Sequence, residues 1–114
     1  MMLTDYDIEC LEKARALIEK NSSLHHSIDS IAQQVGMSAT RLKAGFKQHY
    51  GSGLYTYLRQ QRMQLALELL ADRNKTIKAI AKTTGFRHTS NFTHAFKKAF
   101  GVTPGEKRRA LVSR

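Results

Sequence analysis

The sequence contains the segment Ser27-Ile-Asp-Ser-Ile-Ala-Gln-Gln-Val-Gly-Met37, and a similar segment, Thr76-Ile-Lys-Ala-Ile-Ala-Lys-Thr-Thr-Gly-Phe86, follows it at an offset of 49 residues. In both segments the residues of one helix face recur at positions i, i+3, i+4 and i+7. These residues are Ile28, Ile31, Ala32 and Val35 in the first copy and Ile77, Ile80, Ala81 and the less apolar Thr84 in the second. Each copy also starts with a suitable N-cap and ends its helix at a glycine. Each copy is therefore predicted to begin with a short helix.

A second helix is predicted after each glycine. Its apolar residues match between the copies at an offset of 50, so the second copy has one more residue in its turn; the matched residues are Leu42, Phe46 and Tyr50 against Phe92, Phe96 and Phe100. Ser38 is the expected N-cap of the first of these helices, and the second begins near His88 or Thr89. Two helices joined by a glycine turn, with a basic outer face on the second, form the helix-turn-helix pattern. Ordinary helical hairpins are the alternative, but packing alone does not explain two basic outer faces.

Three further helices complete a predicted all-α chain of about seven helices. One spans residues 5–20, a long connecting helix spans residues 54–71, and Pro104 opens a short last helix, where proline is tolerated. At 1.5 Å per residue the connecting helix is about 27 Å long. Its inward residues are predicted to be Leu54, Leu58, Leu65, Ala66, Leu69 and Leu70. The predicted organisation is a first helix-turn-helix subdomain at 1–52, the connecting helix at 53–73 and a second subdomain at 74–114.

The charge of the chain points to a polyanionic partner. The 114 residues carry a net charge of +10, and because residues 1–26 carry −2, the rest carries +12. A basic segment of this kind favours nucleic acid over a merely solvated surface or a helix lying on a membrane. The single cysteine excludes an internal disulfide and fits a reducing cytoplasm. No signal peptide, membrane span, metal-ligand spacing or catalytic set is recognisable, so we expect no membrane association, no metal, no cofactor and no enzymatic activity.

The second copy carries the most specific motif. The stretch Gly85-Phe-Arg-His-Thr-Ser-Asn-Phe-Thr-His-Ala-Phe-Lys-Lys-Ala-Phe-Gly-Val-Thr-Pro104 resembles the signature of the DNA-binding domain of AraC/XylS transcription regulators. That signature has Gly-Phe, three variable residues, Ser-x-Phe, three more, Phe-Lys-Lys and then Gly-x-Thr-Pro. The first copy fits as well, and the resemblance covers residues 11–108. The sequence departs from it at Lys107-Arg108, where the family commonly has Tyr-Arg, and at His88, where the family often has an acidic or hydroxyl cap.

The resemblance implies sequence-specific binding to double-stranded promoter or operator DNA in a bacterial cytoplasm, with RNA polymerase as a further partner. The segment Leu42-Lys43-Ala-Gly45-Phe46-Lys47 resembles the corresponding segment of regulators that carry a separate sensory domain. It therefore implies an N-terminal effector-binding domain that this chain lacks, although a self-contained small regulator is also open. Whether the protein activates or represses transcription is open too.

The resemblance also implies which residues touch DNA, with the two second helices entering successive major grooves. The expected base-reading residues are Thr40, Arg41, Lys43 and Ala44 in the first copy and Thr89, Ser90, Thr93 and His94 in the second. The expected phosphate contacts are Ser38, Lys47, Arg87, Lys97 and Lys98. Arginine and lysine are suited to guanine, and alanine or threonine methyl groups to thymine, whereas phosphate contacts fix the register without reading sequence.

Two residues outside these sets have expected structural roles, and one alternative function remains. Gly45, which matches Ala95, is expected to allow the close approach of another helix, and Arg62 is expected to brace the two halves. The alternative function is non-specific nucleic-acid packing. Unequal outward residues in the two copies favour sequence-specific binding, because a packing protein needs no such difference.

Overall fold

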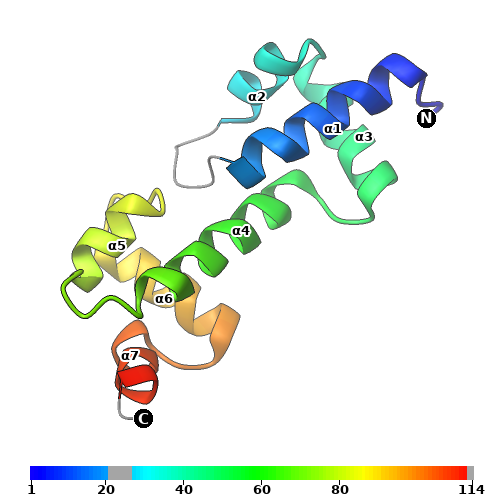
Figure 1. Cartoon of the computed structure of the whole chain (residues 1–114). Coiled ribbons are helices and arrows are strands. Elements are labelled where there is room, and N and C mark those ends of the chain that lie inside the picture. Colours follow the sequence, from blue (N-terminus) through cyan, green and yellow to red (C-terminus); the bar gives the residue numbers. More distant parts are fainter. Residues whose placement is uncertain (21–26, 113–114) are drawn as a thin grey trace. The chain divides into compact units, whose positions relative to one another are not determined.

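A computed structural model describes residues 1–20 and 27–112, and this part of the chain forms seven α-helices and no β-strand. The helices are α1 (Asp5–Lys20), α2 (Ile28–Val35), α3 (Ala39–Tyr50), α4 (Leu54–Leu69), α5 (Ile77–Thr83), α6 (Thr89–Phe100) and α7 (Pro104–Val112), as Figure 1 shows. The prediction of an all-α chain is confirmed. Within the described ranges, no helix is long and apolar enough to cross a membrane.

The chain forms two compact units, Met1–Gln61 and Arg62–Arg114, and the boundary falls inside α4. Leu54 and Leu58, from the start of this helix, are buried in the core of the first unit. Met63 and Ala66, from its later part, are buried in the core of the second. Helix α4 therefore supplies side chains to both units. The repeat found in the sequence corresponds to α2 and α3 in the first unit and to α5 and α6 in the second.

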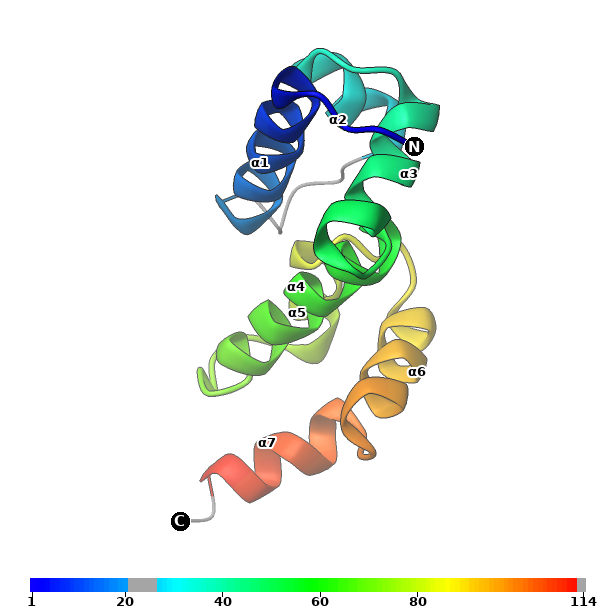
Figure 2. The ribbon, with the colours of Figure 1, turned by 90° about the vertical axis from the view of Figure 1, so that its right-hand side faces the viewer.

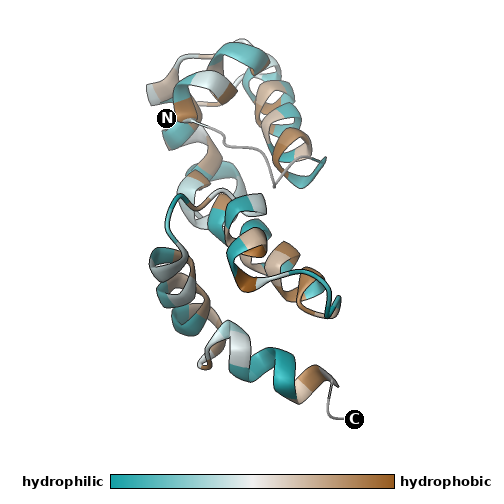
Figure 3. Cartoon of the chain, turned by 90° about the vertical axis from the view of Figure 1, so that its left-hand side faces the viewer, coloured by the Kyte–Doolittle hydropathy of each residue, from teal (hydrophilic) through white to brown (hydrophobic). Residues whose placement is uncertain are grey.

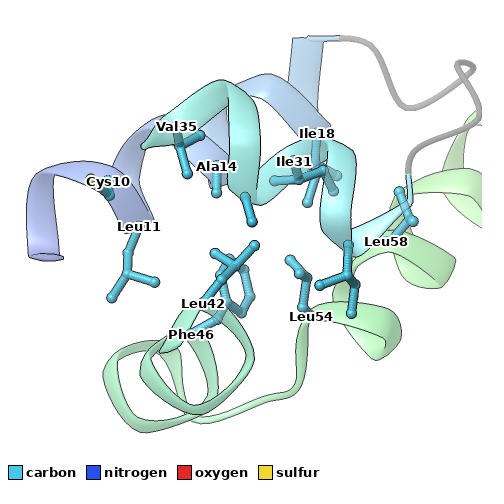
Figure 4. Packing of buried hydrophobic residues seen from close by; sticks show 12 residues of the cluster. Cys10, Leu11, Ala14, Ile18, Ile31, Val35, Leu42, Phe46, Leu54 and Leu58 are labelled. Carbon is cyan, nitrogen blue, oxygen red and sulfur yellow. The ribbon is translucent and has the colours of Figure 1, made fainter. Parts of the chain in front are cut away.

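In the first unit, α1, α2 and α3 contact one another (Figures 1 and 2). Figure 4 shows their apolar side chains converging with those from the start of α4. The contributors are Leu11, Ala14 and Ile18 from α1, Ile31 and Val35 from α2, Leu42 and Phe46 from α3, and Leu54 and Leu58 from α4. Cys10 is part of this buried cluster as well. The first recognition-type helix, α3, thus rests on a layer made by α1 and α2.

Local interactions fix where the helices of the first unit begin and end. The Ser27 hydroxyl accepts a hydrogen bond from the Ser30 amide at 3.0 Å, and the Ser38 hydroxyl accepts one from the Arg41 amide at 3.2 Å. Gly36 has φ = 85°, a left-handed conformation that side chains with a Cβ disfavour. These observations confirm the predicted caps and the glycine turn between α2 and α3.

Helix α1 packs against α3 beside Gly45, which is buried. A Cβ at this position would lie 3.3 Å from Leu3 Cδ2 and 3.4 Å from Leu11 Cδ1. The prediction that this position needs a small residue is therefore confirmed. Because α1 and the residues before it press on this side of α3, the opposite side is left to solvent.

In the second unit, α6 packs on α5 and on α7. Its core contains Phe92 and Phe96 together with residues of α4 and α5. The less apolar residue of the repeat, Thr84, is fully buried, and its hydroxyl donates to the Ile80 carbonyl at 2.9 Å. Thr84, at the C-cap of α5, thus bonds the backbone of its own helix where the first copy has an apolar residue.

The Arg62 side chain lies near the turn between α5 and α6. Its guanidinium carbon would lie 3.1 Å from a Cβ at Gly85.

Figure 3 shows that most helices carry both apolar and polar residues along their length, as expected where one face of a helix is buried and the other is exposed. The middle of α7 is strongly hydrophilic, in agreement with its segment Glu106, Lys107, Arg108 and Arg109. Its Arg108 side chain donates to the carbonyls of Leu70 and Asp72, at 3.2 and 3.1 Å. Arg108 therefore satisfies two carbonyl groups just after the carboxyl end of α4. These hydrogen bonds attach α7 to the rest of the second unit.

Candidate nucleic-acid interface

The outer face of α3 presents four exposed side chains at positions i, i+3, i+4 and i+7. These residues, which we call the α3 stripe, are Thr40, Lys43, Ala44 and Lys47. The residues between them, Leu42, Gly45 and Phe46, are buried. The stripe thus lies on the side of the helix away from α1 and α2. Its members are three of the four predicted base-reading residues of the first copy and one predicted phosphate contact.

Helix α6 presents the same arrangement 50 residues later. We call the equivalent residues the α6 stripe; they are Ser90, Thr93, His94 and Lys97. Thr93 is half-buried and the other three are exposed, as are the flanking Thr89 and Lys98. Phe92, Ala95 and Phe96 point into the core instead. All the predicted contact residues on α6 are therefore at least partly accessible to a ligand.

The two stripes share one end and differ in the rest. Both finish with a lysine, Lys47 or Lys97, at the seventh position after their first residue. Before it, the α3 stripe has a lysine and an alanine, and the α6 stripe has a threonine and a histidine. A shared cation is suited to the same phosphate contact in both copies, whereas different polar and methyl groups are suited to different bases.

Arg41, the fourth predicted base-reading residue of α3, is placed differently. Its guanidinium Nε donates to Asp7 Oδ1 at 2.9 Å, and its Nη2 donates to Asp7 Oδ2 and to the Met2 carbonyl, the latter at 3.1 Å. The hydrogen bonds from Arg41 and from the Thr4 amide hold the pKa of the Asp7 carboxyl well below its ordinary value. The guanidinium is therefore engaged by α1 and the residues before it, and it does not belong to the α3 stripe.

The helix starts differ as well. The Ser38 hydroxyl is already used as a cap of α3, so its contribution to a phosphate site would come through the amides at that helix end. His88 occupies the N-cap of α6 and makes no side-chain capping hydrogen bond. The departure from the family signature at His88 therefore leaves amides of the first α6 turn without that cap. Arg87, just before it, is exposed.

The net charge is divided very unequally between the two units. Met1–Gln61 has seven Lys+Arg and six Asp+Glu, a net charge of +1, whereas Arg62–Arg114 has twelve and three, a net charge of +9. In the first unit the acidic residues lie largely on α1, where Asp5, Glu9 and Glu12 are exposed. Attraction to a polyanion that depends on charge alone is therefore concentrated in the second unit.

Sequence reasoning missed Asp7. It belongs to the acidic first segment, whose residues were counted as charge and given no individual role. The available signal was its spacing from Thr4, since an acid three residues after a threonine is typical of a capping box. The structure shows that box, with the Asp7 amide donating to Thr4 Oγ1 at 3.1 Å and the Thr4 amide donating to Asp7 Oδ2 at 2.9 Å. The pairing with Arg41 had no comparable signal.

Comparisons with known proteins agree with this arrangement. Residues 31–110 match a family model described as a helix-turn-helix domain. The chain is 34% identical over 97 residues to the HTH-type transcriptional regulator GlxA of Rhizobium meliloti, a match that covers 82% of this chain and 30% of GlxA. It is also 34% identical over 91 residues to the probable transcription factor PqrA of Proteus vulgaris, covering 80% of this chain and 73% of PqrA. The chain thus spans about a third of the length of GlxA and of several other curated relatives.

A solved structure gives the same result. The C-terminal domain of AraT, a response regulator from Geobacillus stearothermophilus, is similar with a TM-score of 0.84 and 32% sequence identity, covering 96% of this chain and 88% of that one. The family model covers more than half of the chain, and PqrA is matched over most of its length. From its two helix-turn-helix copies, its repeated stripes and these matches, we conclude that the chain belongs to the family of AraC-type helix-turn-helix domains of transcription regulators.

Proposed function

We propose that this domain binds double-stranded DNA sequence-specifically, with α3 and α6 each placing its stripe in a major groove. The observation that carries the proposal is the repeat of one exposed stripe at equivalent positions of two helices, with a common lysine and different remaining residues. Two copies of a docking helix give two places to contact DNA. Their different side chains give two different base preferences.

In this proposal the residues divide into two roles. Thr40, Lys43 and Ala44 on α3 and Thr89, Ser90, Thr93 and His94 on α6 face base edges, where lysine donates to guanine and methyl groups contact thymine. The cations Lys47, Arg87, Lys97 and Lys98 contact phosphates, together with the helix end at Ser38. The engaged Arg41 is left out of both roles. The second unit, with its net charge of +9, supplies the larger part of the electrostatic affinity.

We further propose that one molecule spans two successive grooves on one face of the duplex. The support is α4, a continuous helix of 16 residues that is about 24 Å long and enters both cores. Because the two copies are tandem and unequal, the expected site is asymmetric, with two parts spaced by about 10 base pairs. Footprinting on a selected site tests this. Protection of one part alone, or a strict need for two molecules on a palindrome, would contradict it.

In the cell, we propose, the domain works as part of a bacterial transcription regulator on cytoplasmic DNA. The lengths of relatives such as GlxA support an additional effector-binding domain before it, and RNA polymerase is the expected partner at the promoter. PqrA, of which the chain covers 73%, supports a shorter regulator as the alternative. A reporter gene placed behind the selected site, in cells with and without the gene for this protein, would show whether transcription depends on the protein.

The central experiment selects binding sites from random DNA and then compares variants at fixed salt. Lys43→Ala and His94→Ala are each expected to relax base preference in a different part of the site, by about 1–3 kcal/mol for a well-placed contact. Lys97→Ala is expected to weaken binding to all sequences alike. Lys13→Ala is the matched control, because Lys13 is exposed on α1 and pairs with Glu9 at 3.4 Å.

The salt dependence of binding gives the complementary measurement. If about six to eight basic residues and helix ends contact phosphate, log K is expected to fall against log[salt] with a slope of about −5 to −7. A nearly flat dependence would contradict DNA binding. Equal affinity for the selected site and for random DNA would instead favour non-specific nucleic-acid packing, to which the charge of the second unit is also suited.

A further inference from the structure

The Arg41 side chain lies at the edge of the proposed DNA-binding face. Arg41 directly follows Thr40 in the chain. The Arg41 side chain is 38% exposed to solvent, whereas that of its partner Asp7 is 6% exposed. A guanidinium at such a position on α3 can reach a phosphate or a base edge if it is free, because arginine is long and carries five donors. In the structure it turns toward α1 and binds the buried carboxylate of Asp7 in a bidentate manner.

The acceptor for Arg41 is held in place by hydrogen bonds that do not involve the arginine. The Asp7 carboxylate is held by the Thr4 amide at 2.9 Å, and the Asp7 amide is held by Thr4 Oγ1 at 3.1 Å. The residues ahead of α1 add a second acceptor, since the Met2 carbonyl accepts from Arg41 at 3.1 Å. The same segment is attached further along α3, where Gln48 Nε2 donates to the Met1 carbonyl at 2.7 Å. Two acceptors fixed in place favour a charge-assisted fork over a flexible surface contact.

We propose that Asp7 is a specificity-determining residue, which acts by withholding the Arg41 guanidinium from DNA. The inference rests on the proposed function of α3. With Arg41 engaged, the α3 face reads DNA with Thr40, Lys43 and Ala44 alone. A released guanidinium would add a phosphate contact that carries no sequence information, or a preference for guanine that the site does not otherwise have.

The second copy supports this reading of the first. The residue equivalent to Arg41 at the offset of 50 is Asn91, which is exposed and uncharged. Neither α3 nor α6 therefore presents a free guanidinium at this position. In α6 the side chain itself is neutral, and in α3 the charge is neutralised by Asp7. Positive charge at the helix faces is thus confined to the stripes and their flanks.

The test compares two single variants, each with a matched control of the same charge change, and the double variant that combines them. Asp7→Asn keeps the shape of the side chain and removes the charge that holds Arg41, and Asp5→Asn removes the same charge from an exposed residue two positions away. Arg41→Gln removes the guanidinium, and Lys13→Gln removes an exposed cation of α1. The double variant Asp7→Asn/Arg41→Gln separates release of the guanidinium from loss of the carboxylate. Circular dichroism confirms the fold of each.

Asp7→Asn is expected to steepen the slope of log K against log[salt] by about 0.9, the value for one added phosphate contact, and to do so beyond any change in Asp5→Asn. It should also tighten binding to random DNA more than binding to the selected site. The double variant is expected to return to the slope of the unmodified protein. Arg41→Gln by itself should behave as Lys13→Gln does, with unchanged base preference.

Two results would overturn the inference. The first is a change in base preference, or a slope flatter by about 0.9, in Arg41→Gln relative to Lys13→Gln, because Arg41 would then contact DNA already. The second is identical binding by Asp7→Asn and Asp5→Asn.

If Asp7→Asn fails to fold, the NMR signal of the Arg41 Nε–H group in the unmodified protein provides the test instead. This signal should stay unchanged when DNA is added, and a shift of the signal would overturn the inference. Absence of any DNA binding by the unmodified protein would overturn the proposed function, and the inference with it.

Discussion

Replacement of Gly36 by alanine is expected to destabilise the first unit through two separable effects. Gly36 ends α2 with φ = 85°, so any side chain there incurs the cost of a left-handed backbone. A Cβ at this position would also lie 2.7 Å from the Tyr6 hydroxyl oxygen, which donates to the Gly36 carbonyl at 2.8 Å. The tyrosine ring can swing away because Tyr6 is 60% exposed, but its hydrogen bond is then lost.

Gly51 provides the matched control within the same unit. It ends α3 with φ = 83°, and nothing lies within 4 Å of a Cβ built on it. The left-handed conformation costs an alanine about 1–2 kcal/mol, and a gain of about 0.4–1 kcal/mol from the stiffer unfolded chain offsets part of it. Gly51→Ala should therefore cost about 1 kcal/mol. Gly36→Ala should cost about 0.5–1 kcal/mol more, the lower part of the range for a hydrogen bond, because the Tyr6 bond is exposed.

The assay is urea unfolding followed by circular dichroism, with both variants also made in a Tyr6→Phe background. With m near 2 kcal/mol/M, the two midpoints should differ by about 0.3–0.5 M in the parent background. The difference should vanish with phenylalanine at position 6, because the ring carbon that then remains, Cζ, lies 3.9 Å from the added Cβ. Equal midpoints in the parent, or a difference that persists with phenylalanine, would refute the assignment of the extra cost to the hydroxyl.

Three more outcomes follow from the structure. The pKa of the Asp7 carboxyl lies below its ordinary value. The stabilisation by the ionised carboxylate should therefore be fully present above about pH 4 and be lost as the pH falls further. Urea unfolding from pH 7 to pH 3 should show this loss of stability, and Asp7→Asn should abolish this part of the pH dependence. Arg108→Gln should lower the stability of the second unit by about 1–2 kcal/mol, since it loses the bonds to Leu70 and the following turn, while Arg109→Gln, at an exposed position, should have almost no effect on the melting curve. Gln64→Pro, at an exposed position of α4, should break the helix at a cost of about 3 kcal/mol or more, and footprints should then lose their fixed spacing before non-specific binding is lost.

The local structure of this chain could be predicted because its determinants are short-range. A hydroxyl that caps a helix three residues on, as at Ser27 and Ser38, depends only on neighbouring backbone. The ends of the recognition-type helices at Gly51 and Gly101 follow from the freedom of glycine to adopt positive φ. The outward stripes follow from the same periodicity, because the buried residues of α3 and α6 leave only one other side to solvent.

The buried face of α4 was harder to predict, because this helix contributes side chains to two different cores. Leu65 and Leu69 were expected to point inward, but they are half-buried, and Met63 is buried in addition to Ala66 and Leu70. The helix also ends at Leu69 and a turn follows, so the predicted end at residue 71 was wrong. Helical periodicity defines which residues share a face, but the partner helices decide which face is covered.

Local sequence patterns predicted seven helices, the caps at Ser27, Ser38 and Thr76, and the outward side chains of α3 and α6. The packing of distant segments, in contrast, selects which of the cations are engaged by an acidic partner. Arg41 and Lys43 are equivalent by sequence, since both lie in a basic helix without a nearby acid. Only the fold brings Asp7, 34 residues away, against Arg41. An ion pair of this kind depends on the packing of α1 on α3 and on the burial of the carboxylate, and neither is encoded in local spacing, because both arise when distant segments exclude water together.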